Sequence, residues 1–174
     1  LALQHSERAL AIAQELGHPH LLARCLTSAA QAYSFLRRWD RALPHVLQTH
    51  QMYVASGDLV LAANSRRGIG FLQIFSGEAA AALDTLQESL AFSRRIENLM
   101  GAADCAWILA RAHLELGNYG EAVKLGRQAV EQTHALGHPL LYALARSALG
   151  IIQRTVLDWE SAEATLLTLF AQSP

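Results

Sequence analysis

The side chains of this sequence that most readily suggest metal chemistry are its eight histidines. A zinc site draws histidine, cysteine or carboxylate ligands from a few closely spaced positions. His134 and His138 are four residues apart, but Gly137 lies between them and Pro139 follows, which indicates the end of a helix rather than one helical face. No pattern of the zinc-protease or zinc-finger kind appears. We therefore expect neither a metal site nor a cofactor.

Catalytic patterns are also missing from the sequence. It contains no phosphate-binding glycine loop and no nucleophile elbow. The short stretch Gly68-Ile69-Gly70 lies inside a helical pattern, and carboxylates such as Asp40, Asp84 and Glu163 fall on predicted exposed faces or helix caps. These observations predict a protein that is not an enzyme.

Composition narrows the class of protein further. Hydrophobic residues make up 52% of the 174 residues and charged residues 17%, which is typical of a chain that buries a core. The net charge of −1 disfavours direct binding to nucleic acid, which usually needs a basic excess. The apolar stretches are short and interrupted, so we expect no membrane span. The chain starts inside a helical pattern and without a signal-peptide layout, so we expect a cytoplasmic fragment of a longer protein.

The elements that must position any functional side chain follow from an internal repeat of 40 residues. Gly17, Gly57, Glu97 and Gly137 align without a gap. We predict a single helical repeat domain over 1–174, with a leading helix at 1–16 and repeats at 17–56, 57–96, 97–136 and 137–174. Two columns hold only small residues, which would let the two helices of a repeat approach closely: Ala30, Gly70, Ala110 and Gly150, and Ala42, Ala82, Ala122 and Ala162.

Each repeat contains two stretches with helical periodicity, and no stretch alternates as a strand would. The fold class is therefore all-α, a superhelix of four helix–turn–helix repeats after one leading helix. The first helices are predicted at 18–36, 58–75, 98–116 and 138–156. The second helices are predicted at 39–56, 78–96, 119–136 and 159–172, with the leading helix at 2–16.

Residues typical of helix ends support these boundaries. Proline suits the first turn, aspartate and asparagine cap the N-terminus, and glycine takes the left-handed conformation after the C-terminus. Asn118 followed by Glu121 predicts a capping box. The other predicted starts are Pro19, Asp58, Asn98, Pro139 and Asp158, and the predicted left-handed ends are Gly17, Gly57 and Gly137.

The two cysteines occupy the same position of the repeat. Cys25 and Cys105 align with Ser65 and Ala145, so all four repeats carry a small residue there. This pattern indicates a packing position rather than reactive thiols. Two repeats separate the cysteines, which places them beyond disulfide reach.

The third repeat carries a pattern known from a protein family. Its large–small pair Leu109-Ala110, turn Gly117, aromatic Tyr119 and small Ala122 resemble the tetratricopeptide repeat. The usual period of that repeat is about 34 residues, and the longer period here resembles the helical arrays of bacterial signal-transduction ATPases and maltose-regulator-type transcriptional activators. The first repeat departs from the pattern at its turn, where Arg37 replaces the usual glycine.

The resemblance implies that the first helix of each repeat lines a concave binding groove. Arginine and aromatic side chains there would suit a partner's acidic and apolar groups. An alternative is that Trp107 and Phe71 belong to the core. The groove positions implied by the resemblance are Arg24, Thr27, Gln31 and Ser34, then Asn64, Arg67 and Phe71, then Asp104, Trp107 and Arg111, and finally Ser147, Ile151 and Arg154.

The function implied is that of a non-catalytic scaffold that binds a protein or peptide. The resemblance suggests the sensor or interaction segment of a larger bacterial signalling or transcriptional regulator, whose partner could be another domain of the same protein. Two alternatives stay open: a domain that senses a small-molecule inducer, and a structural spacer or self-association module that forms a homodimer of the fragment.

Overall fold

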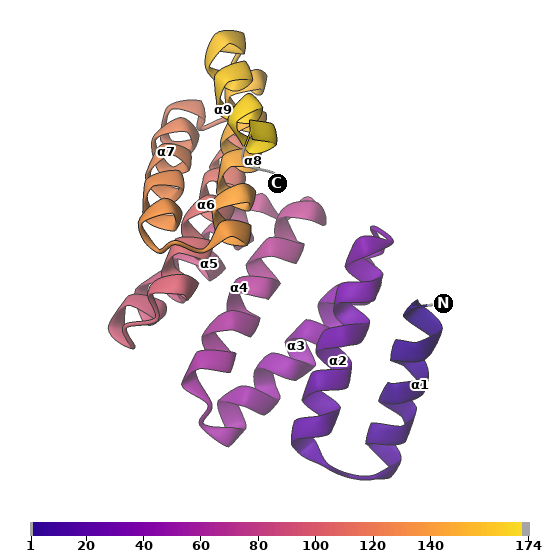
Figure 1. Cartoon of the computed structure of the whole chain (residues 1–174). Coiled ribbons are helices and arrows are strands. Elements are labelled where there is room, and N and C mark those ends of the chain that lie inside the picture. Colours follow the sequence, from indigo (N-terminus) through magenta and orange to yellow (C-terminus); the bar gives the residue numbers. More distant parts are fainter. Residues whose placement is uncertain (1, 172–174) are drawn as a thin grey trace. The chain divides into compact units, whose positions relative to one another are not determined.

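The computed structural model describes residues 2–171, with side chains from Leu3 to Leu167. This part of the chain is folded into α-helices joined by short turns and contains no strand (Figure 1). The all-α prediction is therefore confirmed, and the predicted helix bounds agree with the observed ones to within one residue, apart from the predicted end of the last helix at residue 172, which lies outside the described residues. The helices are α1 (Ala2–Glu15), α2 (Pro19–Phe35), α3 (Trp39–Ser56), α4 (Leu59–Phe75), α5 (Ala79–Arg95), α6 (Leu99–Glu115), α7 (Tyr119–Ala135), α8 (Pro139–Thr155) and α9 (Trp159–Ala171).

The chain divides into two compact units, Leu1–Glu78 and Ala79–Pro174, which we call unit 1 and unit 2. Unit 1 contains α1 to α4 and unit 2 contains α5 to α9, and within each unit every helix packs against the next one along the chain. The boundary falls between the two helices of the second predicted repeat. The organisation as one domain of four repeats stays a prediction.

Left-handed residues produce the regular spacing of the helices. Gly17, Gly57 and Gly137 have φ angles of 61°, 72° and 62°, as predicted from their positions. The turn after α2 uses the same conformation at Arg37, with a φ of 55°, although arginine carries a Cβ that disfavours it. Because nearly every helix has the same length and the same turn, two helices and two turns produce the period of 40 residues.

The helix caps follow the predictions except at one helix. Asp58 accepts a hydrogen bond from the Leu61 amide at 3.0 Å, and Asn98 accepts one from the Gly101 amide at 2.9 Å. The predicted capping box of α7 is wrong, because the Asn118 side chain accepts no such bond. The carboxylate of Glu121 is instead 3.2 Å from Lys124 Nζ, one turn further along the helix.

The two small columns lie where the helices of a pair approach each other. Ala42 and Ala122 are fully buried, and Ala110 is fully buried beside them in its own column. A Cβ added to Gly150 would lie only 2.7 Å from Leu166 Cδ2, so α8 and α9 approach too closely for a larger residue without a shift. These contacts confirm the predicted role of the small residues in packing.

The cysteines behave as packing residues. Cys105 is fully buried and Cys25 is half-buried, and both are free thiols. The Cys105 thiol lies 3.4 Å from the Ser89 hydroxyl on the neighbouring helix α5.

Candidate functional site

Unit 1 contains a cavity of about 460 Å³ between α2, α3 and α4. Helices α2 and α4 each pack against α3 but make no comparable backbone contact with each other, which leaves room between them. The volume is within the range of about 300–1,000 Å³ that is usual for ligand sites. The lining residues are Thr27, Ala30, Gln31, Ser34, Phe35, Trp39, Val46, Thr49, Tyr53, Leu61, Asn64, Ser65, Arg67, Gly68, Phe71 and Leu72.

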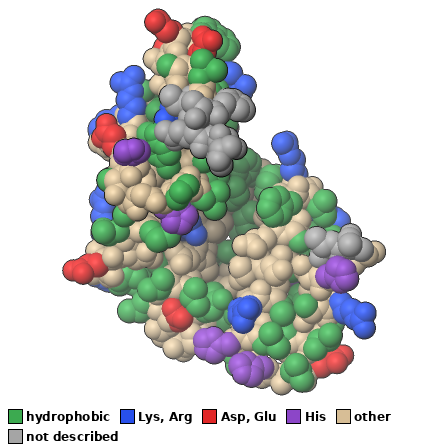
Figure 2. Space-filling model, in the orientation of Figure 1, with side chains coloured by type: hydrophobic (Ala, Val, Ile, Leu, Met, Phe, Trp, Pro, Cys, Tyr) green, Lys and Arg blue, Asp and Glu red, His purple; other side chains and the backbone are tan. Residues whose placement is uncertain are grey.

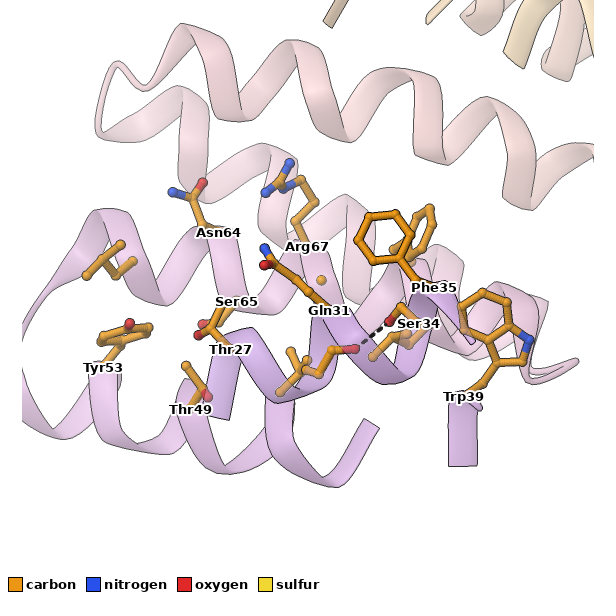
Figure 3. A pocket seen from close by; sticks show the side chains of 16 residues that line it. Thr27, Gln31, Ser34, Phe35, Trp39, Thr49, Tyr53, Asn64, Ser65 and Arg67 are labelled. Carbon is orange, nitrogen blue, oxygen red and sulfur yellow. Dashed lines mark hydrogen bonds between the residues drawn. The ribbon is translucent and has the colours of Figure 1, made fainter. Parts of the chain in front are cut away.

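The cavity has a buried floor and an exposed rim. Thr49 and Tyr53 of α3, with relative exposures of 2% and 8%, lie at the floor. Phe35, at the end of α2, is 89% exposed at the rim. In Figure 3 the polar ends of Gln31 and Asn64 lie on one side of the cavity, away from Phe35. A molecule bound in the cavity would therefore be exposed to solvent at the rim and buried at the floor.

Aromatic rings form one end of the cavity. Trp39 stacks on Phe75 with ring centroids 4.9 Å apart and an interplanar angle of 26°. Phe71 contacts the same Phe75 ring at 4.8 Å in a tilted arrangement. Because α3 begins at Trp39 and α4 ends at Phe75, the ring cluster joins the start of one helix to the end of the next. Such rings offer a large apolar contact area at low cost in side-chain entropy.

Three hydroxyl groups in the lining use their hydrogen within their own helix. Thr27 donates to the Ala23 carbonyl oxygen at 2.9 Å, Ser34 to that of Ala30 at 2.8 Å, and Thr49 to that of His45 at 2.8 Å. A hydroxyl has one hydrogen and two lone pairs. Once its hydrogen is used, each of these groups can only accept a hydrogen bond from a molecule in the cavity.

His50 links α3 to α4 beside the floor of the cavity. Its Nδ1 lies 3.1 Å from the Ala62 carbonyl oxygen and 3.0 Å from Ser65 Oγ, both on α4. Since a carbonyl oxygen can only accept, Nδ1 carries the hydrogen and donates it. Burial, and to a smaller extent the charge of Arg66, lowers the pKa of His50 below its ordinary value. The neutral imidazole is thus the form that suits this position.

Electrostatically, the lining is nearly neutral. Arg67 is the one charged side chain among the lining residues, and no carboxylate is among them. Gln31 and Asn64 add amide groups, which both donate and accept hydrogen bonds. The cavity therefore offers apolar rings, hydroxyl acceptors, amides and the guanidinium group of Arg67, and it offers no partner to a cation.

The structure gathers the predicted groove residues of the first two repeats around this cavity. Gln31, Asn64, Arg67 and Phe71 line it, together with Thr27 and Ser34. Arg24 is exposed on α2 and is not among the lining residues. Whether these side chains bind a partner stays a prediction, but their convergence was expected from the repeat register.

The groove residues predicted on α6 make local contacts within unit 2. Trp107 donates through Nε1 to Asp104 Oδ1 at 2.5 Å and packs against the buried cluster of Ala106, Ala129 and Ala145. Arg111 pairs with Glu115 one turn along the same helix at 3.0 Å. Of the two interpretations left open for Trp107, its packing favours a core residue.

On α8, the three predicted residues lie in different environments. Ser147 is half-buried and Arg154 is exposed. Ile151 packs against the buried cluster that contains Leu114 and Ile152. These three residues of α8 therefore do not share one environment.

Sequence reasoning missed the contribution of α3 to the cavity. Trp39, Thr49 and Tyr53 line it from the second helix of the repeat, and Phe35 lines it from the last residue of α2. The resemblance directed attention to first helices alone. The signal available was the aromatic column of the repeat, in which Trp39 aligns with Tyr119 and Trp159.

Other kinds of site were sought in the part of the chain that the structure describes. No group of three or more potential metal ligands occurs among these residues. None of the described helices combines the length and apolar character needed to cross a bilayer. On the face shown in Figure 2, charged side chains are scattered among hydrophobic and uncharged polar ones.

Comparison with known proteins agrees with this geometry. A family model described as tetratricopeptide repeat matches residues 61–133. The fold is a tetratricopeptide-like helical repeat. This confirms the resemblance seen in the third repeat, and the match runs from the fourth helix to the seventh. No curated protein matches the chain.

Solved structures with tetratricopeptide-like arrays superpose on nearly the whole chain. A Rap protein complexed with Competence and Sporulation Factor matches with a TM-score of 0.86 at 15% identity, over 97% of this chain and 47% of that protein. Aspartyl phosphate phosphatase F from Bacillus subtilis matches with a TM-score of 0.68 at 13% identity, over 97% of this chain and 54% of that one. BtubC (BKLC) from P. vanneervenii matches with a TM-score of 0.71 at 18% identity, over 95% and 69%. The chain thus spans about half of the Rap protein, and at these identities the likeness shows the fold alone.

Proposed function

We propose that this chain is a non-catalytic scaffold that binds a protein or peptide, and that the cavity of unit 1 is its binding site. The observation that carries the proposal is the convergence of Gln31, Asn64, Arg67 and Phe71 on one cavity between two first helices. Apolar rings with a few placed polar groups are what a recognition site needs.

The structural neighbours support this kind of partner. One neighbour is a Rap protein in complex with a second factor, and its array superposes on this chain. We extend the proposal to the sensor or interaction segment of a larger, cytoplasmic bacterial regulator, as the 40-residue period suggests. The partner would then be a separate peptide or another domain of the same protein.

A peptide-display selection against the chain tests the proposal. Affinities of the selected peptides would be measured by fluorescence anisotropy for the wild type, for Asn64→Ala in the cavity and for His20→Ala outside it. Removing a polar partner at the interface should weaken binding about 5–100-fold, which corresponds to about 1–3 kcal/mol. His20→Ala, at an exposed position of α2 outside the lining, should leave binding unchanged. A selection that yields no binder, or binders insensitive to Asn64→Ala, would contradict the proposal.

The size of the cavity favours small-molecule sensing as a second candidate function. A volume of about 460 Å³ would hold a metabolite as readily as part of a peptide. A thermal-shift screen discriminates between the two, because a ligand at 100 times its Kd adds about 2.7 kcal/mol to the free energy of unfolding. A shift produced by metabolites, together with no selected peptide, would favour this alternative. Homodimer formation stays a prediction, and light scattering over a dilution series would test it.

A further inference from the structure

The two units carry the same helix arrangement with different side chains at the cavity. Helices α2, α3 and α4 of unit 1 align, two repeats apart, with α6, α7 and α8 of unit 2. At the place of Thr27 in unit 1, unit 2 has Trp107, and at the place of Ser34 it has Leu114. Comparing equivalent positions in the two units therefore shows which side chains unit 2 has where unit 1 has its cavity.

Large side chains occupy this space in unit 2. Leu114 is buried in a cluster with Ala110 and Ile152, and Ile151 packs against that cluster. Trp107 packs against a second cluster that draws residues from α6, α7 and α8. Accordingly, α6 and α8 pack directly against each other, whereas α2 and α4 make no comparable contact.

The helix between the two first helices, α3 in unit 1 and α7 in unit 2, shows the reverse difference in side-chain size: it carries the larger residue in unit 1. In unit 1, Val46 of α3 lies against Gly68 of α4, with Cγ1 3.4 Å from where a glycine Cβ would be. At the place of Val46, unit 2 has Gly126, and Leu149 Cδ1 lies 3.0 Å from where its Cβ would be. The missing side chain of Gly126 thus lets α8 approach α7 closely. At the equivalent positions unit 1 has the smaller residues Thr27 and Ser34 on α2 and the larger residue Val46 on α3.

We propose that the cavity of unit 1 is the anchor site for one aromatic side chain of the partner that donates a hydrogen bond, an indole or a phenol, and that unit 2 has no counterpart of this site. The inference rests on the proposed function and names the chemistry of the segment bound. The neighbouring main chain of that segment lies over Gln31 and Asn64, whose amides pair with peptide groups.

The chemistry of the lining selects this guest. Trp39, Tyr53 and Phe71 supply apolar walls for a ring. The hydroxyls of Thr27 and Thr49 present only lone pairs, because each donates its hydrogen to its own helix. A ring that carries an N–H or O–H group satisfies these acceptors. Arg67, the one charged side chain of the lining, would attract a phosphate or carboxylate, but such a group has no hydrogen to offer the Thr27 and Thr49 acceptors. An ammonium group would find no carboxylate in the lining.

The probes are blocked single residues, which isolate the anchor from the rest of a partner. N-acetyl-tryptophan amide, N-acetyl-tyrosine amide and N-acetyl-phenylalanine amide would be titrated into the whole chain, with binding followed by NMR chemical-shift changes of the protein amides. The tryptophan or tyrosine amide should bind about 3–10-fold more tightly than the phenylalanine amide, which lacks the donor. The shifts should fall on α2, α3 and α4. Equal affinity for all three probes, or shifts confined to unit 2, would overturn the proposal.

The variant Thr27→Trp places in unit 1 the residue that unit 2 carries at the same position. It should fill the cavity and weaken probe binding more than 10-fold, whereas His20→Trp, at an exposed position of the same helix outside the lining, should not. If Thr27→Trp loses helicity by circular dichroism, Ser34→Leu provides the second filling substitution. Unchanged probe binding in a folded, filled variant would contradict the proposal.

The display selection separates this proposal from the proposed function. If selected peptides bind and contain no tryptophan or tyrosine, or if they bind the filled variant as tightly as the wild type, the anchor is wrong and the scaffold function stands. If the peptides depend on one tryptophan or tyrosine and lose affinity in the filled variant, both stand. If neither peptides nor probes bind, both fail. If blocked amides bind but peptides that contain them do not, the site takes a free small molecule, and the assignment to a partner segment is overturned.

Discussion

The close contact between α8 and α9 predicts the effect of a single methyl group at Gly150. A Cβ at this position would lie 2.7 Å from Leu166 Cδ2 and 2.8 Å from Leu166 Cγ, well inside ordinary van der Waals distance. Overpacking of this kind costs about 1–3 kcal/mol. Alanine is at the same time favoured over glycine within a helix by about 0.8–1.0 kcal/mol. Gly150→Ala should therefore lower the free energy of unfolding by about 1 kcal/mol.

A matched substitution in the same unit isolates the contact. Gly120 lies in the first turn of α7, and no atom lies within 4 Å of where its Cβ would be. Gly120→Ala should raise the free energy of unfolding by about 0.5–1 kcal/mol, since only the propensity effect remains. Urea denaturation followed by circular dichroism would measure both variants against the wild type.

A double-mutant cycle tests the cause of the loss. Leu166→Ala removes the atoms that the new methyl group would meet, so in that background Gly150→Ala should become stabilising by about 1 kcal/mol. If Gly150→Ala is as stable as the wild type, or if its effect is the same with and without Leu166, the close approach of α8 and α9 is not what requires a glycine.

Three further predictions concern the turn, the floor of the cavity and the caps. Leu157 has a φ of 64° and an exposed side chain, so Leu157→Gly should raise the free energy of unfolding by about 0.5–1 kcal/mol in the same denaturation assay. Because burial lowers the pKa of His50, the unfolded chain takes up its proton first. Its contribution to stability is complete above the unfolded pKa of about 6.5 and decreases as the pH falls below that value. His50→Gln should thus reduce the loss of stability between about pH 7.5 and pH 5.5, and an unchanged pH dependence would refute this. Asn98→Ala removes a cap and should cost about 1 kcal/mol, whereas Asn118→Ala should change stability by less than about 0.5 kcal/mol, because its side chain accepts no cap bond.

The helices and their order could be predicted from the pattern of residue types. Their bounds depend on local chemistry: periodicity within one helix, caps such as Asp58 and Asn98, and left-handed turns such as Gly57. These interactions connect residues a few positions apart, so the pattern of residue types is enough to find them. The same reasoning failed at Asn118, whose side chain makes no cap bond, while the Glu121 carboxylate pairs with Lys124 instead.

Which helices enclose a cavity could not be predicted from that pattern and became clear only from their packing in three dimensions. Thr27 and Trp107 hold equivalent positions in the repeat, and the resemblance assigned both to a groove. In the structure one lines open space and the other packs against a buried cluster. Whether a cavity forms depends on the distance between the two first helices. It also depends on the total volume of the side chains that these helices and the helix between them place in the space. A repeat register predicts which residues share a face, but it does not specify the distance across that face.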